Sequence, residues 1–136
     1  MEGSNQMMMD YAISKKVTTS FNDTVNRVTS ELQKEGFGII TEIDLRSKFR
    51  EKLGKDFRNY TILGACNPKL AYEAIQKESR VGVMLPCNVL VQEHKSGEVE
   101  ISAINPMQSI GVVGNAELNS LAEDVTNKLK AALERI

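Results

Sequence analysis

Two kinds of hydrophobic spacing alternate along the first half of this chain. In residues 11–17, 37–43 and 59–66, β-branched and apolar side chains alternate loosely with polar ones, a pattern typical of strands. Over about 21–35 and 45–53, apolar residues recur every three or four positions, which predicts helices. The first half is therefore predicted to run strand, helix, strand, helix, strand.

Residues with helix-capping side chains stand where helices should begin. Ser20, with Asp23 three positions later, resembles a capping box before the first helix, and Asp44 precedes the second. Asn67 is followed by Pro68, which loses no needed donor at a first helical position, so a third helix is predicted from there.

The helix predicted over 45–53 has two different sides. Its apolar residues, Leu45, Phe49 and Leu53, are expected on an inner side that packs against the protein. The other side, which we expect to face solvent, carries Arg46, Lys48, Arg50, Glu51 and Lys52.

The second half predicts a hairpin and a terminal helix. Residues 81–94 are too long for one regular strand with a central proline, so we expect two extended pieces joined by a kink or bulge at Pro86. The second piece should pair with residues 98–104 through a tight turn that contains Gly97. Asn115 is expected to cap the longest helix, which keeps apolar residues at helical spacing to the end of the chain.

These elements predict an α+β fold with two layers. We expect a mixed, mostly antiparallel sheet of about five strands, with helices on one face and a long C-terminal helix. The chain has 136 residues, which suits a flexible N-terminal segment over 1–9 and a single domain over 10–136. The uncovered face of such a sheet has to be solvated or buried, so we expect a homodimer.

Composition excludes several classes of protein. The formal net charge is -1 and aromatic residues make up 5% of the chain, which argues against a nucleic-acid partner. No stretch approaches the roughly 20 apolar residues of a membrane span, and the first residues lack the features of a secretory signal, so we expect a cytoplasmic protein without a membrane partner. No phosphate-binding glycine loop, nucleophile elbow or metalloprotease motif is present, which favours a non-catalytic role.

The two cysteines are the strongest candidates for chemistry. Cys66 and Cys87 are each followed by asparagine, Asn67 and Asn88, and each pair is predicted near a strand end. Cys66 would precede a helix N-terminus, whose partial positive charge favours a thiolate and can also hold an anion. We predict a site formed by these four residues if the two strands are neighbours; alternatively, both thiols are small buried apolar groups. With two cysteines and His94, which we expect on an exposed hairpin, the chain lacks four ligands for a structural zinc site.

Three segments, ILGACNPKLAYEAIQ, GVMLPCNVLVQE and AINPMQSIG, resemble the signature of the domain of unknown function 302 family. The resemblance covers roughly Met9 to Ile136 and implies a compact α+β domain that is often dimeric and has no established activity. Asn105 stands where the family commonly has an acidic residue before the last proline.

Three functions fit these observations. The first is a dimeric, non-catalytic binding protein for a small molecule, an anion or a metal ion held around Cys66, Asn67, Cys87 and Asn88; the ligand, metal or cofactor is not identified. The second is a thiol redox protein or thiol-dependent enzyme that uses Cys66 and Cys87. The third is a structural or assembly domain with both cysteines in its core.

Overall fold

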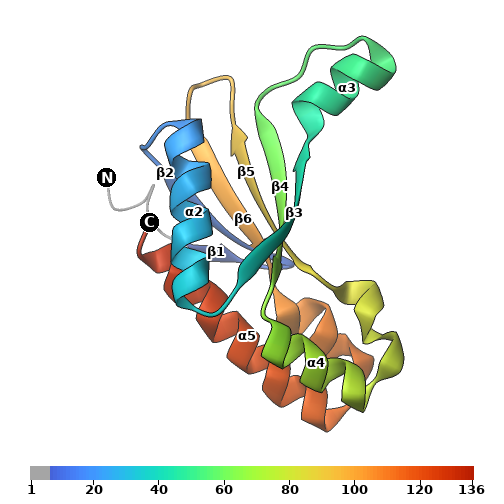
Figure 1. The fold of residues 1–136 in the computed structure, drawn as a ribbon. Coiled ribbons are helices and arrows are strands. Elements are labelled where there is room, and N and C mark those ends of the chain that lie inside the picture. The colour runs from blue at the N-terminus through green and yellow to red at the C-terminus, as the bar shows by residue number, and fades with distance from the viewer. Residues whose placement is uncertain (1–6) are drawn as a thin grey trace.

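A single antiparallel sheet forms the centre of the protein, which we describe from a computed structural model over residues 7–136 (Figure 1). The strands follow the order β1-β2-β6-β5-β4-β3, and each neighbouring pair is antiparallel. They are β1 (Met8–Met9), β2 (Ala12–Val17), β3 (Gly38–Asp44), β4 (Tyr60–Cys66), β5 (Cys87–Glu93) and β6 (Val99–Ile104). The predicted α+β class is confirmed, with six antiparallel strands where we expected about five in a mostly antiparallel sheet.

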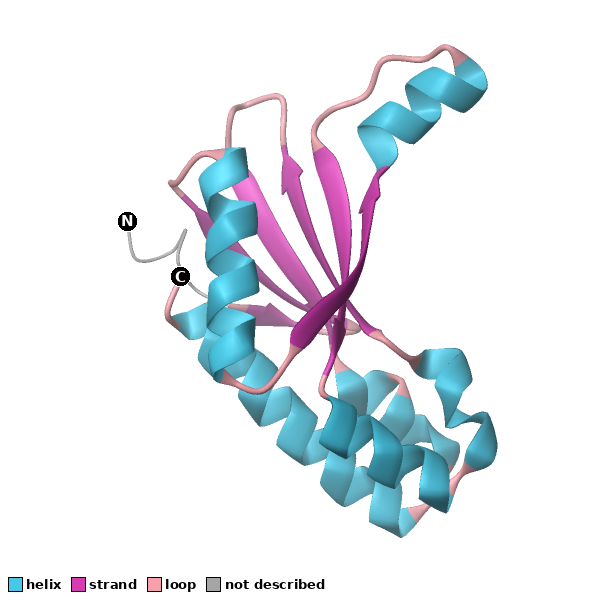
Figure 2. Cartoon of the chain, in the orientation of Figure 1, coloured by secondary structure: helices cyan, strands magenta, loops and turns pink. Residues whose placement is uncertain are grey.

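Two helices cover one face of this sheet, and the others lie beyond its ends (Figure 2). The helices are α2 (Phe21–Lys34), α3 (Leu45–Leu53), α4 (Pro68–Lys77) and α5 (Ala116–Glu134), with short 3-10 helices η1 (Ser79–Met84), η2 (Pro106–Gln108) and η3 (Ile110–Val113). Helices α2 and α5 pack together over the sheet, and α4 packs against α5. The long C-terminal helix was predicted correctly.

The predicted caps position these helices. The side chains of Ser20, Asp44, Asn67 and Asn115 each accept a hydrogen bond from a backbone N–H in the first turn of α2, α3, α4 and α5. Gly54 ends α3 in the left-handed conformation, with φ of 65°.

The segment before Pro86 is helical, so the prediction of an extended piece there was wrong. Ser79–Met84 forms η1, and the strand begins only at Cys87. Val81 in η1 is 2% exposed and packs with Ala74 of α4 in a small core cluster. Burial against α4 therefore outweighs the strand preference of this valine-rich segment.

The predicted inner side of α3 is covered only in part, because Leu45 and Phe49 are half-buried whereas Leu53 is exposed. None of its residues is buried, and Leu53 is 62% exposed. Strands β3 and β4 carry α3 beyond the part of the sheet that α2 and α5 cover (Figure 1). Helical spacing alone cannot say whether another element lies opposite.

At the N-terminus, residues 1–6 of the segment expected to be flexible lie outside the described residues. Met8 and Met9 pair with Ser14 and Ile13 of β2, so the sheet begins two residues before the domain start that we predicted. No helix within residues 7–136 combines the length and the apolar character needed to cross a bilayer.

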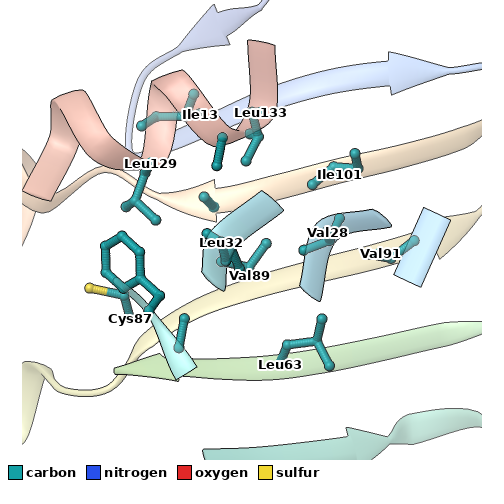
Figure 3. Close-up of a cluster of buried hydrophobic side chains, with 14 of the residues drawn as sticks. Ile13, Val28, Leu32, Leu63, Cys87, Val89, Val91, Ile101, Leu129 and Leu133 are labelled. Carbon is teal, nitrogen blue, oxygen red and sulfur yellow. The ribbon is translucent and has the colours of Figure 1, made fainter. Parts of the chain in front are cut away.

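Two clusters of buried side chains form the core. The larger cluster lies between the sheet and helices α2 and α5, and includes Val28, Leu32, Leu63, Val89, Ile101, Leu129 and Leu133 (Figure 3). The smaller one joins α4, η1, η3 and the first half of α5 through Ala74, Val81, Ile110, Leu118 and Ala122. Cys87 belongs to the larger cluster and lies near its end in Figure 3.

Charged residues fix the C-terminal end of α5 to the sheet and to α2. The Lys15 ammonium, on β2, donates to the carbonyl oxygens of Leu133 at 3.1 Å and Glu134 at 3.4 Å, and its burial lowers the pKa of this group. The Glu31 carboxylate of α2 accepts from Arg135 at 2.6 Å, which holds the pKa of Glu31 below its usual value. The Lys15 bonds bring a positive charge to the last carbonyl groups of α5, where the helix dipole is negative.

Candidate functional site

Cys66 and Cys87 lie on neighbouring strands, as the predicted site requires. Strand β4 pairs with β5, and Ala65 is the partner of Cys87, so Cys66 is one residue beyond the position directly opposite. Ordinary sheet spacing then places the Cα atoms of the two cysteines about 6 Å apart. Disulfides span Cα separations of roughly 4.4–6.8 Å, so the backbone spacing suits one. Strand alternation starts Cys66 on the face opposite to Ala65 and Cys87, so the bond also requires the Cys66 side chain to turn at the end of β4 towards the Cys87 sulfur.

Both cysteines line one small apolar cavity. Its volume is about 20 Å³, room for about one water molecule. The cavity lies between the two core clusters, because its walls include residues of both: Phe37, Ala65, Ala74, Leu85, Ile110, Leu121 and Val125, among others. No lysine or arginine lines it.

The two thiols differ in their access to solvent. Cys87 is 4% exposed, whereas Cys66 is only partly buried, and both are free thiols in this structure. Burial, with a smaller contribution from the neighbouring Cys66, raises the pKa of Cys87 to about 11. At neutral pH Cys87 is therefore a neutral thiol, and a reagent from solvent meets Cys66 first.

Asn67 has a structural role beside Cys66. Its side-chain oxygen accepts from the Leu70 N–H at 3.3 Å, and its amide donates to the Glu35 carbonyl at 3.4 Å. These two bonds join the start of α4 to the turn between α2 and β3. Gly36 in that turn has φ of +88°, and a Cβ there would lie 3.0 Å from the Asn67 amide nitrogen. Asn67 thus fixes the strand end that carries Cys66.

Asn88 lies on the other side of the sheet from Cys87. Consecutive residues of a strand point to opposite faces, and Asn88 is exposed while Cys87 is in the core. The structure therefore brings Cys66, Asn67 and Cys87 to one cavity but does not bring Asn88 there. Strand alternation could have predicted this, because Cys87 and Asn88 are consecutive residues of one strand and therefore point to opposite faces.

Asn88 lines a larger hollow on the uncovered face of the sheet. The hollow has a volume of about 530 Å³. Its other lining residues include Met8, Asp10, Tyr11, Ser14, Tyr60, Leu90, Gln92, Glu100, Ser102, Ile104 and Gln108. Sequence reasoning missed this surface, although alternate residues of the strands supply its polar groups.

Within residues 7–136, no cluster of three or more His, Cys, Asp or Glu side chains is arranged to hold a metal ion. His94 lies 2.8 Å from the Glu100 carboxylate, and Cys66 and Cys87 remain as a two-thiol set. A two-coordinate soft ion is the metal chemistry that such a set allows.

Asn105, which replaces the acidic residue expected before the last proline, is buried and hydrogen-bonded. Its amide donates to the Asp10 carbonyl at 2.8 Å, and its side-chain oxygen accepts from the Met107 N–H at 3.1 Å. The first bond holds the chain after β6 against the N-terminal segment, and the second caps η2.

The sequence matches the family described as "Domain of unknown function DUF302" over residues 13–136. The chain belongs to the DUF302 family. A solved structure with the same fold is the "uncharacterized conserved protein DUF302 from Bacillus stearothermophilus", which is 30% identical in sequence with a TM-score of 0.86. The similarity covers 93% of this chain and 98% of that one. No curated protein matches this DUF302 chain.

Proposed function

We propose that this DUF302 protein is a thiol redox protein in which Cys66 and Cys87 form a reversible disulfide. The observation that carries the proposal is that two free thiols on neighbouring strands line the same apolar cavity. We expected a binding protein first, because the closely spaced cysteine pair of thioredoxin-like proteins is absent from the sequence. The pairing of β4 with β5 supplies in space the proximity that the sequence lacks.

The size and the apolar wall of the cavity favour a disulfide between Cys66 and Cys87 over a bound organic molecule or anion. A volume of about 20 Å³ excludes an organic molecule, for which sites usually need roughly 300 Å³ or more. An anion would find no lysine or arginine in the cavity wall. A disulfide is neutral and leaves no charge in this apolar site, whereas a bound anion or a dithiolate does.

The difference in access between the thiols gives an order of steps. The Cys66 thiolate attacks one sulfur of a low-molecular-weight disulfide, forms a mixed disulfide and releases one small thiol. Cys87 then loses its proton to solvent and attacks the Cys66 sulfur, which forms the intramolecular disulfide and releases the second small thiol. The chain loses two protons and two electrons, and the small disulfide takes them up and becomes two thiols.

The raised pKa of Cys87 makes both directions of this exchange slow. Cys87 is rarely a thiolate at neutral pH, so the second oxidation step is infrequent. During reduction, a thiol with a high pKa is a poor leaving group from the attacked Cys66 sulfur. In the reducing cytoplasm that we expect for this protein, the pair would stay reduced until oxidant accumulates.

Mass spectrometry of the intact chain in oxidised glutathione tests the proposal. The wild-type chain should lose two hydrogens, and dithiothreitol should restore them. The matched variants identify the roles: Cys87→Ala should stop with one glutathione on Cys66, and Cys66→Ala should stay unmodified.

Two other results would replace this function with another. If the reduced wild-type chain instead binds one equivalent of Cu(I) and both single variants lose that binding, the thiol pair is a soft-metal site. If neither reaction occurs, the cysteines act as core residues in a structural domain.

A further inference from the structure

The segment that leaves the sheet beside β3 and β4 has an apolar side that is covered only in part, with Leu53 exposed at its end. It comprises α3 and the loop to β4, residues 45–59, and we name it the arm. In Figure 1 the arm projects beyond the strands. No residue of α3 is buried, and Leu53 is 62% exposed although it lies on the apolar side of the helix. A helix of nine residues is marginal by itself, so the exposed Leu53 at the end of its apolar side needs an explanation.

The arm is held in shape by its own contacts. The rings of Phe49 and Phe57 meet edge to face with centroids 5.0 Å apart. Arg50 forms an ion pair with Asp56 at 2.6 Å, and the Arg58 guanidinium lies over the Phe57 ring at 4.5 Å. The arm is therefore preorganised for a contact, which lowers the entropic cost of making one.

Charge is divided unequally between the arm and the rest of the chain. The arm contains six of the 17 lysines and arginines and two of the 18 acidic residues, a formal charge of +4. The remaining 11 basic and 16 acidic residues give the rest of the chain a charge of -5. Two copies that bring arm against arm would place like charges together, whereas an arm against the body of a second copy brings opposite charges together.

The hollow on the uncovered face of the sheet has the properties that complement the arm. Asp10 and Glu100 line it, and no lysine or arginine does. Met8 and Tyr11 in its wall are 70% and 77% exposed, so it also offers apolar surface. Its volume of about 530 Å³ is large enough to receive side chains of a helix.

We propose that the arm of one copy docks into the hollow of a second copy, and that the contact is reciprocal about a two-fold axis. Each protomer then contributes one arm and one hollow, and the interface is closed and isologous. Leu53 is placed against apolar residues such as Tyr11, while Lys52 and Lys55 lie near Asp10 and Glu100. This contact does not depend on the thiol chemistry of Cys66 and Cys87.

Charge reversal of each surface tests the docking. The arm variant carries Lys52→Glu and Lys55→Glu, and the hollow variant carries Asp10→Lys and Glu100→Lys. Sedimentation equilibrium of the wild type should give a dimer of the 15.1 kDa chain. Each variant alone should raise the dissociation constant at least about tenfold, because each places like charges together.

An equimolar mixture of the two variants should recover the dimer, because the two new glutamates of one arm then meet the two new lysines of the other copy's hollow, and the unchanged positive arm meets the unchanged acidic hollow. Lys77→Glu with Lys95→Glu, two exposed sites outside both surfaces, makes the same change in net charge as the arm variant and should leave the wild-type dimer intact. Thermal unfolding of every variant checks that the monomers are folded.

Two results would overturn the proposal. A wild type that stays monomeric at all concentrations leaves the arm without a second copy to bind. If the hollow variant dimerises as well as the wild type while the arm variant does not, the arm contacts the second copy at a surface other than the hollow.

Discussion

Replacing Cys87 with alanine is expected to remove part of the pH dependence of stability at alkaline pH. Burial raises the pKa of the Cys87 thiol to about 11 in the folded chain, from an ordinary value of 9.0 that we assign to the unfolded chain. Between these two values the unfolded chain releases the proton while the folded chain keeps it. The contribution of Cys87 to stability is therefore fully present below pH 9 and is lost as the pH rises towards 11.

The size of the effect follows from the two pKa values. Each pKa unit corresponds to about 1.36 kcal/mol, so the two-unit difference gives a total loss of about 2.7 kcal/mol. At pH 10 the loss is about 1.4 kcal/mol relative to neutral pH. The buried Lys15, whose pKa is lowered, contributes a change of opposite sign, and it cancels when the wild type and Cys87→Ala are compared.

Urea unfolding in the presence of a phosphine reductant, between about pH 8 and 10.5, measures this difference. The free energy of unfolding of the wild type should fall with pH relative to Cys87→Ala. Cys66→Ala, which leaves Cys87 in the core, should keep most of the wild-type slope. A difference between wild type and Cys87→Ala that stays constant across this range would refute the reasoning, because it would mean that the thiol ionises equally in both states.

Three further substitutions test packing and charge in the fold, each by urea unfolding at neutral pH. Gly64→Ala should destabilise the chain by about 1–3 kcal/mol, because a Cβ there would lie 2.1 Å from the Thr41 hydroxyl oxygen; adding Thr41→Ala should recover part of the loss. Lys15→Met should cost about 1–2 kcal/mol, because it removes a charged donor from the last carbonyl groups of α5; no measurable loss would mean that solvent satisfies them. Glu31→Gln should also destabilise the chain, because it weakens the bond that Arg135 donates. Arg135→Gln removes the same bond from the other side, so the losses of the two single variants should not add in the double variant.

Local chemistry made much of the fold predictable. The side chains of Ser20, Asp44, Asn67 and Asn115 cap helices where their neighbours in the sequence indicated, because capping depends only on nearby backbone groups. The hairpin between β5 and β6 was predictable for the same reason, since Gly97 supplies the positive φ of its turn.

The errors arose where the outcome depends on residues far apart in the chain. Val81 lies in a 3-10 helix because α4 and α5 offer it a core, and nothing in its own segment records that. Leu53 is exposed because no element lies opposite α3 in the described chain. At the candidate site, the nearness of Cys66 to Cys87 depends on β4 pairing with β5, which the sequence did not establish, whereas strand alternation alone places Asn88 on the opposite face.

The pairing of β2 with β6 has a consequence for how the protein is made. The hydroxyl groups of Ser14 and Ser102 are hydrogen-bonded across these strands although they are 88 positions apart in the chain. During translation, β2 leaves the ribosome long before β6, its partner on the side away from β1, exists. Until β5 and α5 are also synthesised, the apolar side of α2 lacks most of its cover, so the nascent chain has a prolonged interval in which a chaperone can bind it.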